Sequence, residues 1–88
     1  MLFYVKIQLL MDRMQDMYAR IAAGEVPSPA ALSTIYCSSE TPGLGYAIFD
    51  VESRTRLDDV LLKLKPYSEV YEIAPVITLE EFQARMSR

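Results

Sequence analysis

The middle of the sequence reads Glu40-Thr41-Pro42-Gly43-Leu44-Gly45-Tyr46-Ala47-Ile48-Phe49-Asp50-Val51 and sets the topology of the chain. The first six of these residues combine a proline with two glycines, which is the composition of a turn. The apolar run from Tyr46 to Val51 is typical of a β-strand, and another strand is expected before the turn, from Ala31 to Ser39. Residues 31–51 therefore predict a β-hairpin at the centre of the chain.

A helix is predicted on each side of this hairpin. Before it, residues 11–23 place apolar side chains at helical spacing and end at Gly24. The side chains expected to face inward from this helix are Met11, Met14, Tyr18, Ile21 and Ala22. After the hairpin, Ser53 is a suitable N-cap for a helix that ends before Pro66. This second helix has the clearest apolar stripe of the chain, formed by Leu57, Val60, Leu61 and Leu64.

Two outer strands and a terminal helix complete the pattern. From Leu2 to Leu9, apolar residues alternate with mixed ones, which indicates a strand with one buried face. Residues 69–77 are also rich in β-formers, and Pro75 cannot donate to a ladder, so this strand is expected at a sheet edge. Thr78-Leu79-Glu80-Glu81 is a capping-box pattern, and the helix that it opens is predicted to turn Phe82 and Met86 inward.

The order βαββαβ plus a terminal helix predicts an α+β, ferredoxin-like fold in a single domain over residues 1–88. Right-handed crossovers place both main helices on one face of a four-stranded antiparallel sheet and leave the other face bare. The side chains expected on the bare face are Tyr4, Lys6, Thr34, Tyr36, Tyr46, Ile48 and Asp50. Glu72 is assigned to the same face, because a carboxylate under the helices would lose its hydration without gaining a partner. A slip of one residue would exchange Glu72 for Tyr71 and Ile73.

Composition favours self-association and excludes several kinds of site. Hydrophobic residues make up 51% of the 88, which is more apolar surface than so small a monomer easily hides, so we expect a homodimer or higher oligomer. With no histidine and one cysteine, the chain cannot build an imidazole acid/base, a mixed Cys/His zinc site or an internal disulfide, and no metal site is predicted. The single Cys37 is expected to be buried and inert.

Charge and hydropathy argue against nucleic-acid and membrane partners. A net charge of -3 is not the basic footprint of a nucleic-acid-binding protein. Residues 45–47 fit part of the RNA-recognition signature, but Leu44 stands at its basic position and Asp50 would meet phosphates with a negative charge. The apolar run at residues 2–5 is interrupted by Lys6 and is far too short for a membrane span. Without an export or anchoring signal, the expected location is the cytoplasm.

Two segments, Met1-Leu2-Phe3-Tyr4-Val5-Lys6 and Tyr46-Ala47-Ile48-Phe49-Asp50-Val51, resemble the corresponding strands of muconolactone isomerases. The resemblance implies the dimeric α+β barrel superfamily, in which two such sheets pack face to face around a cavity. It also implies cofactor-free work on small, often aromatic-derived or lactone-like molecules. Tyr4 departs from the pattern, because the isomerases have a histidine there, and the polar positions that match the two segments are Lys6 and Asp50.

These observations define a candidate site on the bare face. Lys6 is the predicted anion anchor, Glu72 is the predicted base, and the predicted substrate-binding residues are Tyr4, Tyr36, Tyr46 and Asp50. The alternative to a ligand-binding site is a purely structural role, in which Lys6 and Glu72 form an ion pair and the tyrosines pack a dimer interface. Two functions follow. The first is binding or isomerisation of a small organic molecule between two sheets, and the alternative is a non-catalytic oligomeric or accessory protein on the same scaffold.

Overall fold

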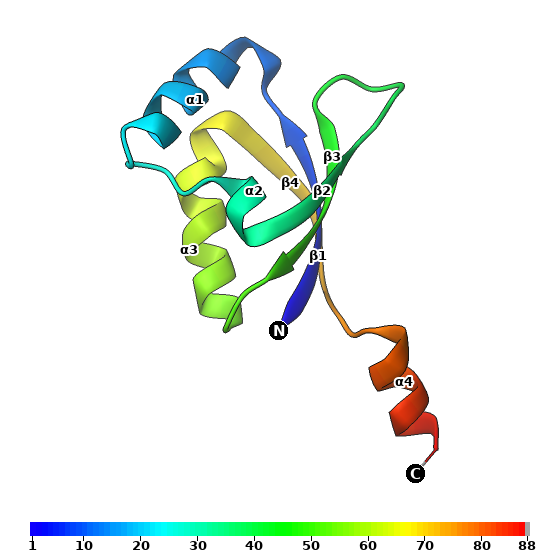
Figure 1. The fold of residues 1–88 in the computed structure, drawn as a ribbon. Coiled ribbons are helices and arrows are strands. Elements are labelled where there is room, and N and C mark those ends of the chain that lie inside the picture. The colour runs from blue at the N-terminus through cyan, green and yellow to red at the C-terminus, as the bar shows by residue number, and fades with distance from the viewer. Residues whose placement is uncertain (88) are drawn as a thin grey trace.

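Helices cover one face of a four-stranded sheet in the computed structural model, which describes residues 1–87 (Figure 1). The elements in chain order are β1 (Leu2–Leu9), η1 (Met11–Arg13), α1 (Met14–Ala22), α2 (Pro29–Leu32), β2 (Ser33–Cys37), β3 (Leu44–Asp50), α3 (Arg54–Leu64), η2 (Lys65–Tyr67), β4 (Ser68–Val76) and α4 (Leu79–Met86). The elements η1 and η2 are short 3-10 turns. The main elements therefore follow the predicted order βαββαβ plus a terminal helix.

The strand order is β2-β3-β1-β4, and every neighbouring pair is antiparallel. This topology is consistent with a ferredoxin-like fold. The strands β2 and β3 form the predicted hairpin, whose turn contains Gly43 at a φ of 81°, a left-handed conformation that glycine adopts without steric cost. At the other side of the sheet, β4 is the edge strand that Pro75 predicted.

The core lies between the sheet and the helices α1 and α3. Alternate residues of the two central strands are buried there, and these are Phe3, Val5, Ile7, Ala47 and Phe49. The predicted stripe of α3 covers them, and all four of its residues are buried. The Ser53 hydroxyl accepts a hydrogen bond from the Arg56 amide at 3.1 Å and fixes the start of this helix. The burial of these residues confirms the predicted buried face of β1 and the predicted apolar stripe of α3.

The first helix turns a different set of residues inward from the set predicted. Met14 and Met17 are buried and Ile21 is half-buried, whereas Tyr18 is 62% exposed and Met11 also lies at the surface. Residues 11–13 form the 3-10 turn, so the α-helix begins only at Met14. Its inward positions then follow the 14, 17, 21 spacing, so Ala22 is exposed as well, and the prediction that Met11, Tyr18 and Ala22 face the core was wrong for that reason.

The strand β2 begins later than predicted and lies at the sheet edge. Residues 29–32 form the short helix α2, so the strand begins at Ser33. Pro29 suits the first turn of a helix, where its missing N–H is not needed, and the Ser33 hydroxyl donates to the Pro29 carbonyl at 2.6 Å. Cys37 is exposed because β2 has a neighbouring strand on one side only, and the expected burial of its thiol was wrong.

The strand β4 contains a β-bulge next to its pairing with the middle of β1. Lys6 pairs with Glu72, but the next residue, Ile7, pairs with Val70, so Tyr71 is an extra residue on β4. At the bulge, the alternation of the β4 side chains between the two faces of the sheet shifts by one residue. The bulge leaves Glu72 on the same face as Lys6, as the sequence predicted.

The terminal helix α4 begins at its predicted cap but does not join the core. The Thr78 hydroxyl accepts a hydrogen bond from the Glu81 amide at 3.1 Å. Phe82 and Met86 are 51% and 70% exposed and α4 buries no residue, so the prediction that both face inward was wrong. The capping pattern determines where the helix begins and carries no information about what its apolar side packs against. Neither α4 nor any other helix of residues 1–87 has the length and apolar character needed to cross a membrane.

Candidate functional site

Four side chains form one row across the open face of the sheet, which is the predicted bare face and carries none of the packed helices. Tyr36 of β2 lies opposite Tyr46 of β3. Tyr46 in turn lies opposite Lys6 of β1, and Lys6 lies opposite Glu72 of β4. Neighbours in such a row have Cβ atoms about 5 Å apart. We call these four residues the polar row, and the sequence placed all of them on this face.

Lys6 occupies the centre of the polar row. Its side chain is half-buried, and its Nζ lies 6.0 Å from the centroid of the Tyr46 ring, at the outer limit of a cation–π contact. The ion pairs found among residues 1–87 do not include Lys6, even though Glu72 is its direct neighbour on β4. The ammonium group is therefore positioned over an aromatic ring and is available to an anion.

A second, mostly apolar row adjoins the polar row. Tyr4 of β1 lies between Ile48 and Ala74, and Thr34 lies on the far side of Ile48. Three of these four side chains are half-buried. A charged row beside an apolar one is the mixed lining that small-molecule sites use, although a single chain presents it as a surface rather than an enclosed cavity.

The structure places Asp50 at the end of the sheet, away from the polar row. The polar row crosses β3 at Tyr46, four residues before Asp50, which places the two about 14 Å apart along the strand. The Asp50 carboxylate instead lies 3.6 Å from the amino group of Met1 at the end of the sheet. Residues that share a sheet face can be far apart along it, so the shared face did not imply a shared site.

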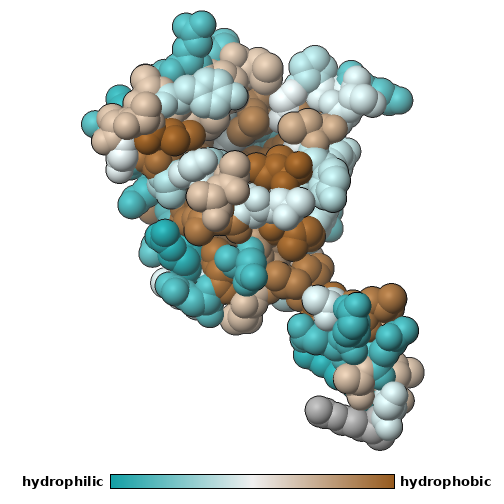
Figure 2. Space-filling model, in the orientation of Figure 1, coloured by the Kyte–Doolittle hydropathy of each residue, from teal (hydrophilic) through white to brown (hydrophobic). Residues whose placement is uncertain are grey.

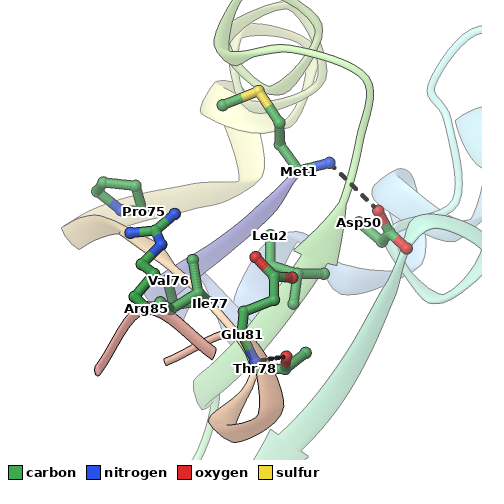
Figure 3. A pocket seen from close by; sticks show the side chains of 9 residues that line it. All are labelled: Met1, Leu2, Asp50, Pro75, Val76, Ile77, Thr78, Glu81 and Arg85. Atoms are coloured by element: carbon green, nitrogen blue, oxygen red, sulfur yellow. Dashed lines mark hydrogen bonds and ion pairs between the residues drawn. The ribbon is translucent and has the colours of Figure 1, made fainter. Parts of the chain in front are cut away.

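Asp50 borders an open hollow of about 950 Å³ that the sequence did not predict (Figure 3). The hollow lies between the end of the sheet and α4, and its lining residues are Met1, Leu2, Asp50, Pro75, Val76, Ile77, Thr78, Glu81 and Arg85. The side chains of Glu81 and Arg85 extend from α4 toward the sheet end (Figure 3). Their i,i+4 spacing was a usable signal that both lie on one side of the helix.

Comparison with known proteins identifies the family. A family model described as a domain of unknown function, DUF3303, matches residues 1–88. The chain belongs to the DUF3303 family. No curated protein and no solved structure matches it. That description assigns no activity to the family.

The polar row gives the DUF3303 chain two phenols, an ammonium and a carboxylate in one line. The ammonium can hold an anionic group, and a carboxylate one strand away is close enough to accept a proton from a bound molecule. The phenols offer flat surfaces and hydroxyl donors. Water reaches the row in a single chain and weakens these interactions, so the chemistry needs a cover over the open face. Residues 1–87 contain no cluster of His, Cys, Asp or Glu side chains arranged to hold a metal ion.

Proposed function

We propose that two DUF3303 chains pack their open faces together as a dimeric α+β barrel and bind a small organic anion between the sheets. The proposal extends to isomerisation of an aromatic-derived or lactone-like molecule, as in the muconolactone isomerases that β1 and β3 resemble. The observation that supports it best is the polar row, in which Lys6 has no ion-pair partner among residues 1–87 and lies between an aromatic ring and a carboxylate.

Each residue of the polar row has a role in this proposal. Lys6 holds the carboxylate of the bound molecule, and Glu72 is the base that accepts its proton. Tyr36 and Tyr46 stack against its flat surface, and Tyr4 extends this wall into the neighbouring row. Asp50 is left out, because it lies at the end of the sheet with Met1.

The dimer is part of the proposal because the site needs a cover. Tyr36 is 67% exposed and Glu72 is also exposed in a single chain. A second sheet would exclude water from the polar row, and charges interact more strongly where water is excluded. Phenol rings with polar tips are also well suited to a protein interface.

Titration with benzoate, a small aromatic carboxylate, tests the binding site. We expect amide chemical shifts of β1 and β3 to move on addition of benzoate, and we expect Lys6→Met to abolish the movement. The matched control is Lys63→Met, which removes the same charge from an exposed position on α3 and should leave binding unchanged. Glu72→Gln should also retain binding, because it removes a negative charge beside the anion. Binding that is the same in Lys6→Met and in the unaltered protein would contradict the proposal.

A non-catalytic oligomeric protein is the second candidate. It is favoured by the position of the hollows, since neither the hollow beside α4 nor a smaller one of about 460 Å³ beside α3 includes a residue of the polar row. In this alternative, the tyrosines only pack the interface and Lys6 meets a carboxylate of the second copy. A stable dimer whose β1 and β3 signals do not respond to benzoate would favour this alternative over ligand binding.

A further inference from the structure

The helix α4 carries an apolar stripe that its own chain does not cover. Leu79, Phe82 and Met86 follow a 3,4 spacing, which places them on one side of a helix. Their side chains are 65%, 51% and 70% exposed. An amphipathic helix normally stabilises itself by burying such a stripe, and an eight-residue helix is too short to be stable by propensity alone.

The polar side of α4 is the side that faces its own chain. Glu81 and Arg85 line the hollow next to Leu2 and the end of β4 (Figure 3). On a helix Glu81 lies roughly opposite Leu79 and Met86, and Arg85 lies at the edge of the stripe next to Phe82. The helix therefore presents its apolar side to whatever lies outside this chain.

The position of α4 points to the space in front of the open face. The helix lies beyond the end of the sheet, on the side away from α1 and α3 (Figure 1). Figure 2 shows hydrophobic atoms on the upper right side of α4, which borders this space. Val76 of the open face and Ile77 line the junction between the sheet and α4, so apolar side chains continue from the open face as far as this junction.

The area of the open face alone is small for a stable dimer. Four strands about 4.8 Å apart, with seven residues that each rise about 3.4 Å, present about 450 Å² per copy. Two faces then bury about 900 Å², whereas stable interfaces bury about 1,200–2,000 Å². The three stripe residues offer about 300 Å² per copy, and with the surface that they cover they bring the interface into this range.

We propose that α4 is a dimerisation arm, and that Leu79, Phe82 and Met86 of each chain pack against the second copy seated on the open face. The proposal rests on the face-to-face dimer of the proposed function and adds a second contact region to it. The occupant is a second copy of this chain, because the stripe borders the space that such a copy fills and its area supplies what the sheet faces lack.

Sedimentation equilibrium of two full-length variants tests the arm. Phe82→Asp places a charge in the stripe, and Ala84→Asp places the same charge on the other side of α4, at an exposed position. We expect Phe82→Asp to raise the dimer dissociation constant at least about tenfold, which equals about 1.4 kcal/mol, and Ala84→Asp to leave it within about twofold. Because α4 buries no residue in its own chain, both variants should retain the circular dichroism spectrum of the unaltered protein.

The outcomes separate the arm from the dimer itself. If the unaltered protein and both variants dimerise with equal strength, α4 is not an arm, and the face-to-face dimer stands without it. If both variants weaken the dimer equally, the arm is also overturned, because the added charge and not the loss of the apolar stripe would then explain the weaker dimer. An unaltered protein that stays monomeric at every concentration would overturn both the arm and the proposed function.

Discussion

Gly43 is the residue at which the central hairpin is most sensitive to substitution. Its φ of 81° is left-handed, and an added Cβ would lie 2.7 Å from the Leu9 carbonyl oxygen and 2.7 Å from Nε2 of Gln8. The Leu9 oxygen cannot move away easily, because the Leu9 amide donates to the Gly43 carbonyl at 2.8 Å. Close approach and backbone conformation both require glycine at this position.

Gly43→Ala should therefore destabilise the fold more than Gly24→Ala. Gly24 has a similar φ of 78°, but nothing lies within 4 Å of the place that an added methyl group would occupy, so it isolates the backbone effect at about 1–2 kcal/mol. We expect Gly43→Ala to cost at least about 1 kcal/mol more than that in urea unfolding. Equal losses for the two variants would show that the hairpin relaxes around the added methyl group.

Tyr67 makes the free energy of unfolding depend on pH in the alkaline range. Burial raises the pKa of its hydroxyl above the ordinary value of 10.0, and the Asp16 carboxylate adds to the rise while Arg20 opposes it. A raised folded-state pKa means that the folded chain holds the proton more tightly than the unfolded chain. The stabilisation is therefore complete below pH 10 and is lost as the pH rises through the folded-state pKa. Urea unfolding at about pH 9 and about pH 11 should show a smaller loss for Tyr67→Phe than for the unaltered protein, and parallel losses would contradict this.

Two helix caps with the same geometry should differ in their effect on stability. Ser53 and Thr78 each accept a hydrogen bond of 3.1 Å from a backbone amide. The helix that Ser53 caps is packed in the core, whereas α4 buries no residue. We expect Ser53→Ala to lower the free energy of unfolding by about 1 kcal/mol.

Thr78→Ala should change the free energy of unfolding by less than about 0.3 kcal/mol, because α4 can fray without unfolding the domain. Both caps are best compared by urea unfolding in a Tyr46→Asp background, where no dimer contributes. A loss of about 1 kcal/mol for Thr78→Ala would mean that α4 is coupled to the core of its own chain.

The elements that local patterns specify were predictable from the sequence. The alternating residues of β1 and the stripe of α3 lie in one core cluster, so periodicity identified this part of the core. Periodicity did not predict the short helical segments that precede α1 and β2. The turn at residues 11–13 altered the inward face of α1, and α2 replaced the start of the second strand.

The strand β4 shows how a desolvation argument can outperform a periodic pattern. Its alternation was ambiguous, because the bulge at Tyr71 changes the phase within the strand. Glu72 nevertheless lies opposite Lys6 on the open face, as the cost of removing a carboxylate from water predicts. For α4, no such argument was possible, since the sequence shows that Phe82 and Met86 share a side but not whether their own chain covers it.

The candidate site was predictable as a face but not as a set of contacts. The cross-strand pairing that joins Tyr36 to Glu72 in one row follows from the register, which a single sequence does not fix. The same register separates Asp50 from the polar row. The open face and the α4 stripe are both left uncovered by one chain, and the proposed dimer accounts for both features with one partner.

The most direct test of this account is the mass of the protein in solution, measured by light scattering during gel filtration. The unaltered protein should have about twice the chain mass of 10.0 kDa. Tyr46→Asp should have the mass of one chain, because burying a carboxylate between the sheets costs several kcal/mol, which pairing with the neighbouring Lys6 offsets only in part. The matched control Tyr18→Asp, at a residue 62% exposed on α1, should remain a dimer. A monomeric unaltered protein, or a Tyr46→Asp variant that stays dimeric, would contradict the account.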